Sequence, residues 1–392
     1  MATGATKPKL APKCFVEGVL YRPAPDEVGA YYSRDDVLDE LLGGMRRWHV
    51  RLEGGEGLKH RWLNTGDRDE LRRTFRRLLD RMSGDSRRVK LPYLRIDGRR
   101  YDPVTSWQAD DLWGLDFGLE KDGWTRRECW DAVVPATKIL DHFGVHYWLK
   151  YTGHHSLHVI VPAENFPTRL GKLQLVEYLP SFHRRLLAFF DRLCFQPLDE
   201  GGFHGPAGTN MPYTLNEDTG LLNYPIRRRE VRRFQPGDSH PSRAKVRSFW
   251  REFPARKRGC AAALLEEVLR PFHEQRPRYP GVKARPPLSL DETLAQMDSS
   301  LARKRKDAVV RLPWFGAPQA SERLLAALSD RSSEVRRAAV KALAGSDDPR
   351  CRRALRKALA ASGPQLARWT RSALKLISDI DVLRRAGHGR KT

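Results

Sequence analysis

The chain has 392 residues and a formal net charge of +23 at pH 7, with 71 Lys and Arg against 48 Asp and Glu. This length suffices for one large domain and a small one whose cores need no disulfide or structural metal. The positive excess favours a polyanionic partner. Because the sequence shows no long apolar run and no signal peptide, we expect nucleic acid rather than a membrane, and a cytoplasmic, nucleoid-associated location.

The cysteines are scattered singly along the chain and form no CxxC pair: Cys14, Cys129, Cys194, Cys260 and Cys351. This spacing argues against a zinc ribbon and against a disulfide framework. We interpret the cysteines as small buried apolar residues in a reducing compartment.

The first 230 residues alternate helix and strand signals, which predicts an α+β fold. Glu70–Met82 has apolar residues at helical spacing and an arginine-rich outer face. Further elements are predicted in chain order: a strand over 112–119 interrupted by Asp116, a helix over 130–144 ending at Gly144, a strand, turn and strand over 145–162, a helix over 177–193, a Gly-rich loop around Asp199 and a turn over 215–225.

Residues 227–258 form a basic segment with 12 Arg or Lys against three acids, and Phe234, Phe249 and Trp250 are interleaved with them. A charge run is usually a solvated surface. Alternation with aromatic residues also suits a groove for single-stranded nucleic acid, because cations follow phosphates and rings stack on bases. We therefore predict that this segment binds nucleic acid.

The C-terminal part contains an internal repeat. Leu324–Leu343 recurs 31 residues later as Leu355–Leu374, with the apolar positions in register. This pattern predicts two helical hairpins over 321–392, joined to residues 1–300 by a linker over 301–320, and it resembles HEAT-like repeats. Because solenoid repeats need about three units to bury a core, we expect the pair to dock on the main domain or on a protein partner.

Three histidines cluster at the start of a predicted strand, in the stretch YTGHHSLHVIVP: His154, His155 and His158. Alternation along a strand would leave two of them converging, so a zinc site is not predicted. The Gly-containing turn and nearby Ser156 offer donors for a phosphate. The alternative is a strand entrance whose polar residues are satisfied by local hydrogen bonds.

Carboxylates flank this stretch in the chain. Asp116 lies on the preceding predicted strand, and Asp199 lies in the following loop. Two carboxylates that converge beside phosphate donors hold divalent cations, and nucleotidyl transfer uses such cations to offset charge on a triphosphate. The order predicts a site for Mg²⁺ or Mn²⁺ next to a nucleoside triphosphate.

The ordered set resembles the archaeo-eukaryotic primase superfamily, which includes primase small catalytic subunits and primase-polymerases. Asp116 is similar to the first acid of the family's first motif. Thr152–His158, followed by VIVP, is similar to its Ser-Gly-x-Arg-Gly-x-His motif. Asp199 is similar to its third motif, and Pro212–Gly220 to a later conserved segment. The resemblance covers roughly residues 20–230.

This resemblance implies a primase-polymerase-like catalytic domain with mixed sheets. It implies metal binding by Asp116 and Asp199, and phosphate contacts from Ser156 and His158. The remaining matched positions, which would lie at the nucleotide, are Thr152, Gly153, His155 and Asn216. The implied partners are nucleoside triphosphates and a single-stranded DNA or RNA template.

The chain departs from the family pattern at several positions. Gly118 stands where the second acid of the first motif belongs, and Glu120, one strand repeat further, is a candidate replacement metal ligand. His, Asn and Asp stand at 155, 216 and 218, where the family has Arg, His and Lys. No zinc site is recognised, because Cys129 and His142 alone do not make one.

Three functional hypotheses follow. The first is a DNA primase or polymerase-like nucleotidyltransferase that makes or extends a chain on a single-stranded template. The second, favoured by Gly118, is a degenerate primase fold that binds nucleic acid or nucleotide without polymerising. The third is an adaptor that acts through the HEAT-like repeats.

Overall fold

A computed structural model of the chain describes residues 23–45, 50–53, 61–63, 66–82, 93–96, 114–118, 126–154, 156–194, 209–217, 219–251, 259–270, 274–275, 279–280, 282, 288–344, 348–361 and 363–388. The chain divides into two compact units. Unit 1 comprises Met1–Thr137, Tyr147–Pro162 and Leu198–Ala255, and unit 2 comprises Lys138–His146, Ala163–Pro197 and Arg256–Thr392.

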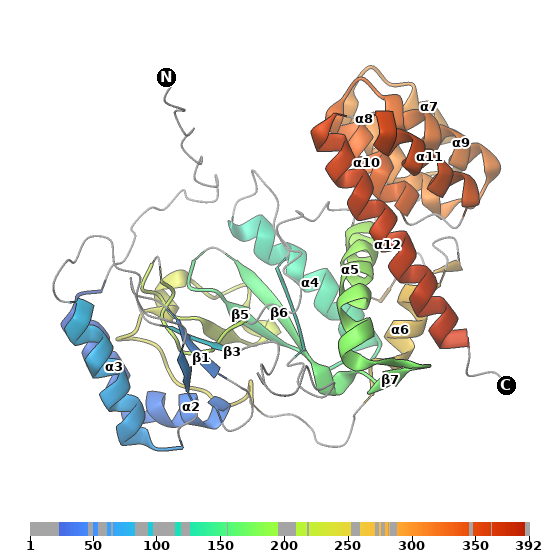
Figure 1. Ribbon diagram of the computed structural model, residues 1–392. Helices are drawn as coiled ribbons and strands as arrows, with labels where there is room; N and C mark the ends of the chain where they lie inside the picture. Colours follow the sequence, from blue (N-terminus) through green and yellow to red (C-terminus); the bar gives the residue numbers. More distant parts are fainter. Residues whose placement is uncertain are drawn as a thin grey trace, which may run out of the picture. The chain divides into compact units, whose positions relative to one another are not determined.

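Unit 1 begins with helices α1 (Pro25–Tyr32), α2 (Asp35–Met45) and α3 (Arg68–Met82) (Figure 1). Helix α3 confirms the predicted helix over Glu70–Met82. Its buried face carries Leu71 and Phe75, and the Phe75 ring stacks on Tyr32 with centroids 3.8 Å apart. Its apolar spacing therefore marks the face that packs on the other two helices, as the sequence pattern predicts.

Two four-stranded sheets form the centre of unit 1. The first has the order β2-β1-β3-β9 and is built from β1 (Val50–Glu53), β2 (Arg61–Leu63), β3 (Tyr93–Ile96) and β9 (Thr209–Asn210). The second has the order β10-β5-β6-β4 and is built from β4 (Gly114–Gly118), β5 (Trp148–Tyr151), β6 (Leu157–Pro162) and β10 (Tyr224–Ile226). Within the described strands every pairing is antiparallel, which corrects the expectation of mixed sheets.

The apolar residues of the second sheet bury it in the core of unit 1. Val159 and Val161 of β6 are buried, as their β-branched run predicts. Helix α4 (Arg126–His142) packs beside the sheet, and its Trp130 meets Tyr151 of β5 edge to face at 5.8 Å. The helix ends before Gly144, whose φ of +66° suits glycine, so the predicted helix end is confirmed. The α+β prediction is confirmed at this level.

Unit 2 combines the helical repeats with a helical layer from the middle of the chain. It contains η1 (Ala163–Asn165), β7 (Arg169–Leu170), β8 (Leu173–Gln174), α5 (Leu175–Cys194), α6 (Ala262–Leu269) and α12 (Pro364–His388). Helix α5 confirms the predicted helix over 177–193. Helix α12 lies along α5 (Figure 1), and Arg384 Nε of α12 donates to the Leu269 carbonyl at 2.7 Å. The last helix of the repeats is therefore also packed on the α5–α6 layer.

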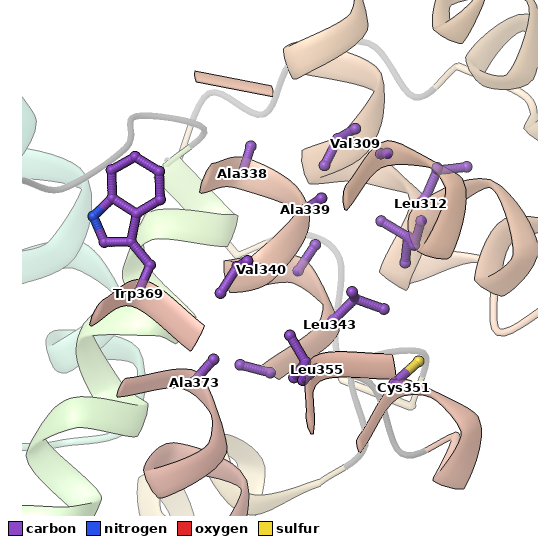
Figure 2. Packing of buried hydrophobic residues seen from close by; sticks show 14 of the residues in the cluster. Val309, Leu312, Ala338, Ala339, Val340, Leu343, Cys351, Leu355, Trp369 and Ala373 are labelled. Atoms are coloured by element: carbon purple, nitrogen blue, oxygen red, sulfur yellow. The ribbon is translucent and has the colours of Figure 1, made fainter. Parts of the chain in front are cut away.

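The repeats themselves comprise α7 (Leu290–Met297), α8 (Ala302–Arg311), η6 (Leu312–Trp314), α9 (Pro318–Ala326), η7 (Ala327–Ser329), α10 (Ser333–Ala344), α11 (Pro349–Ala361) and the first part of α12. Helices α8, α10 and α12 contact one another in succession, and α9 contacts both α7 and α11. Leu343 and Leu355 lie in the buried cluster between these two layers (Figure 2).

The segment predicted as a linker, 301–320, is largely helical. It forms α8 and η6, and Val309 and Leu312 are fully buried in the repeat cluster. The described repeat region thus consists of the hairpins α7–α8, α9–α10 and α11–α12, one more than the 31-residue period predicts. The period is weaker in the first hairpin, which has Thr293, Lys304 and Asp307 where the second hairpin has Leu324, Val335 and Ala338. A third hairpin supplies the stacking that a short solenoid needs.

No helix in the described ranges is long and apolar enough to cross a bilayer.

Candidate functional site

Asp116, Lys150 and His158 project from three adjacent strands of the second sheet. Across β4, β6 and β5, Gly118 pairs with His158 and His158 pairs with Lys150, while Asp116 pairs with Ile160. Directly paired residues share a sheet face, as do residues two apart, so all three polar side chains lie on one face.

Short contacts join the three side chains. His158 Nδ1 is 2.6 Å from Asp116 Oδ1, and Lys150 Nζ is 3.4 Å from Asp116 Oδ2. The ammonium of Lys150 also bonds to the Thr209 hydroxyl and, at 3.1 Å, to the Asn210 carbonyl. The Lys150 side chain is only 2% exposed, so its charge is neutralised inside the protein. Because Thr209 and Asn210 belong to β9, this ammonium ties the two sheets of unit 1 together.

The carboxyl of Asp116 is ionised in this setting. Burial opposes ionisation, but the charges of His158 and Lys150 and the bonds from His158 and Thr209 outweigh it and hold the pKa of Asp116 far below its usual value. A carboxylate with a depressed pKa stabilises the folded state at neutral pH. That contribution declines as the pH falls below about 3.8, the pKa of the Asp116 carboxyl in the unfolded chain.

The described residues do not by themselves complete a divalent-cation site. No group of three or more His, Cys, Asp or Glu in the described ranges is arranged to hold a metal. One oxygen of Asp116 faces His158 and the other faces the Lys150 ammonium, which would repel a nearby cation. The other two predicted metal ligands, Glu120 and Asp199, lie outside the described residues, as does His155.

The turn that precedes β6 is closed by its own backbone. Thr152 N donates to the Ser156 carbonyl at 3.0 Å, and Gly153 adopts φ +78° between them. A Cβ atom on Gly153 would lie 2.6 Å from Asn216 Cβ and 2.7 Å from the Leu221 carbonyl oxygen. Ser156 is buried. The glycine is thus required both for its backbone angle and for close packing.

Hydrogen bonds of the Asn216 side chain join this turn to the predicted 215–225 turn. Its amide nitrogen donates to the Thr152 carbonyl at 3.1 Å, and its amide oxygen accepts from Thr219 N at 3.1 Å. Thr219 in turn donates its hydroxyl proton to the Gly153 carbonyl. The resemblance implies a nucleotide contact for Asn216, whereas these bonds give it a positioning role for the 152–156 turn.

We expect Gly153→Ala to lower the free energy of unfolding by about 1–3 kcal/mol, because alanine is strained at positive φ and its methyl group would meet Asn216 and Leu221. Gly237→Ala is the matched control, since nothing lies within 4 Å of its Cβ position. Urea denaturation of both variants measures the difference. Equal free energies of unfolding for the two variants would show that the turn accommodates alanine at position 153 without loss of stability.

Sequence reasoning did not identify Lys150, and it did not identify the hydrogen bonds of Tyr31 and Tyr32. The signal for Lys150 was a single charge inside WLKY, a strand whose four residues are all buried. Tyr31 donates its hydroxyl proton to the Tyr213 carbonyl at 2.8 Å, and the Tyr32 hydroxyl accepts from Leu215 N at 3.1 Å. The two tyrosines therefore anchor the backbone that leads to Asn216.

The described part of the basic segment contains an exposed arginine group of five residues on the loop after β10: Arg227, Arg228, Arg229, Arg232 and Arg233. The aromatic residues behave differently from the prediction. Phe234 and Trp250 are buried in the core, so they cannot stack on bases, and Phe249 is half-buried with Arg227 4.9 Å above its ring. Periodicity alone did not reveal that these rings face inward.

Residues 290–375 match a family model of HEAT repeats, which confirms the HEAT-like character of the C-terminal part and extends it through the first hairpin. No curated protein matches the chain. A solved structure, the polymerase domain of Mycobacterium tuberculosis ligase D in complex with DNA, is similar with a TM-score of 0.38 and 11% identity, over 53% of this chain and 83% of that one.

Proposed function

We propose that unit 1 binds the phosphate groups of a nucleoside triphosphate beside the Asp116–His158 pair and carries out nucleotidyl transfer on a single-stranded template. The observation that supports this best is the 2.6 Å contact between Asp116 Oδ1 and His158 Nδ1. A carboxylate fixes the orientation of the imidazole and stabilises its protonated form, which suits a phosphate donor. His158 is 22% exposed, so a ligand can reach its ring.

The reaction would require divalent cations beyond what the described residues supply. When bound, Mg²⁺ or Mn²⁺ offsets charge on the triphosphate and on the attacking hydroxyl. Asp116 would contribute one carboxylate, with Asp199 and Glu120 as the further acids that the sequence predicts. Within unit 1, Ser156 and Gly153 shape the turn, Asn216 positions it, and the exposed arginine group would attract the template backbone.

A second candidate function is binding of nucleotide or nucleic acid without polymerisation. Two observations favour it. Lys150 places a buried ammonium 3.4 Å from Asp116, where it provides the positive charge that a cation would otherwise bring. Gly118, directly across from His158, offers no second carboxylate. The HEAT repeats are also compatible with a protein partner, which would make unit 1 a recruited binding module.

Primer extension separates these candidates. We expect weak, Mn²⁺-favoured incorporation on a primed single-stranded template, with His158→Ala and Asp116→Ala each lowering the rate by roughly 10²-fold or more. Gel-resolved extension with each metal measures the rate. His240→Ala and Asp238→Ala, which change residues of the same types elsewhere in unit 1, are the matched controls and should extend normally.

Equilibrium binding of the triphosphate completes the test. Binding without extension in the wild-type chain would favour the second candidate. Absence of both, or activity that survives both site variants, would overturn the placement of the site. Melting temperatures of the variants show whether a loss arises from unfolding instead.

A further inference from the structure

Helix α11 presents a wholly cationic outer face. Its only charged side chains are basic: Arg350, Arg352, Arg353, Arg356 and Lys357. At 100° per residue these five positions span an arc of roughly 160°, while Cys351 and Leu355 on the opposite side are fully buried. The helix is thus amphipathic with a polar face of a single sign.

The first three turns of α12 repeat this arrangement. Arg368, Arg371 and Lys375 are exposed and lie within roughly 60° of one another around the helix, over a length of about 10 Å. Residues 364–375 contain no acid. Ala373 and Ile377 are buried on the other side, so the cationic stripe faces away from the core.

These charges contrast with those of the earlier repeats. Several cations in α8 and α9 pair with acids: Arg305 with Asp330, Lys306 with Glu334, and Arg323 with Asp298. On α11, Arg350 pairs with Asp348, and Arg352 pairs with Asp381. The other three cations of α11 and the three of residues 364–375 form no ion pair with any residue that the structure describes: Arg353, Arg356, Lys357, Arg368, Arg371 and Lys375.

Unneutralised like charges three and four residues apart destabilise a helix by about 0.2–0.5 kcal/mol per pair. An anionic partner removes that repulsion. The exposed positions on α11 and on residues 364–375 include no large apolar side chain, since the exposed large apolar residues of the described chain are Leu301 and Val382. A protein interface usually has an apolar or aromatic centre, which these faces lack. Arginine is well suited to phosphate.

We propose that these six cations, three on the outward side of α11 and three on the outward side of α12, bind the phosphate backbone of nucleic acid. The HEAT repeats then form a second nucleic-acid surface of the chain, in addition to the exposed arginine group of unit 1. The surface would recognise the charge of the phosphates, so we expect its binding to depend little on base sequence.

The experiment measures binding of the full-length chain to a fluorescent 30-nucleotide DNA, single-stranded and duplex, over a range of salt concentrations. The test variant is Arg368→Gln/Arg371→Gln/Lys375→Gln, and a second variant carries Arg353→Gln/Arg356→Gln/Lys357→Gln. The matched control, Lys306→Gln/Arg323→Gln/Arg331→Gln, removes the same net charge from side chains that are bonded to Asp, Glu or a backbone carbonyl.

We expect each test variant to bind at least about tenfold more weakly at low salt. We also expect the log–log salt slope on single strands to fall by up to about 2, at roughly 0.7 per lost phosphate contact. The control should retain nearly the wild-type slope. Test variants that match the control would overturn the proposal, and so would polyglutamate that competes as well as DNA, because it would point to an acidic protein partner.

This surface does not depend on the nucleotidyl-transfer proposal. A wild-type chain that shows the α11–α12 contribution to DNA binding but no primer extension would therefore count against the activity alone.

Discussion

Replacing Lys150 by methionine is expected to lower the free energy of unfolding of unit 1 by about 3–5 kcal/mol, the range for removing one member of a buried ion pair. The change would leave the Asp116 carboxylate without its nearest ammonium, and would leave Thr209 and Asn210 without their shared donor. Hydrogen exchange of β4 and β6 amides in increasing denaturant measures the change in this unit.

Two further variants test the explanation. Lys150→Met/Asp116→Asn should recover part of the loss, since it removes the uncompensated charge. Lys245→Met, at an exposed lysine of the same unit, should stay within about 0.5 kcal/mol of wild type. A Lys150→Met chain as stable as wild type would show that this ammonium is not the counter-ion of Asp116.

The pH dependence gives the same hypothesis a second readout. In the wild type the pKa of Asp116 is depressed on folding, so its contribution is complete at neutral pH and declines as the pH falls below about 4. Without Lys150 the pKa of Asp116 rises, because burial then opposes ionisation with less compensation. The stability deficit of the variant should therefore shrink in acid. A stability difference between wild type and Lys150→Met that stays constant from pH 7 to pH 3 would contradict the assignment of Lys150 as the counter-ion of Asp116.

Leu343→Ala is the second large effect expected. Leu343 is completely buried among α8, α10 and α11 residues of the repeat cluster (Figure 2), and truncation should cost about 2–5 kcal/mol. Leu301→Ala is the control, because Leu301 is 58% exposed, and it should change stability by less than about 0.5 kcal/mol. Urea denaturation of each variant, followed by hydrogen exchange of unit 2, measures both.

The Leu343→Ala variant also shows how far the loss of stability spreads through unit 2. Because α12 contributes to the repeat cluster and also packs along α5, faster exchange is expected in α5 as well as in α10 and α11. Exchange that accelerates in α10 and α11 while α5 stays protected would mean that the repeats unfold separately from the rest of unit 2.

Local patterns were sufficient for much of the secondary structure. Apolar residues at helical spacing predicted α3 and α5, Gly144 marked the end of α4, and the β-branched run of β6 predicted a buried strand. The 31-residue period identified two of the three helical hairpins. These features depend on residues within a few positions of one another, so the sequence encodes them directly.

Features that depend on distant residues were decided only by the tertiary structure. The contact between Asp116 and His158 joins residues 42 positions apart, and the Lys150–Thr209 bond spans 59. Motif order suggested the first contact, but nothing local indicated that a lysine would neutralise Asp116, that Asn216 would brace a turn, or that Phe234 and Trp250 would point inward. Strand pairing and burial set these outcomes, because each depends on which distant segment packs against the residue.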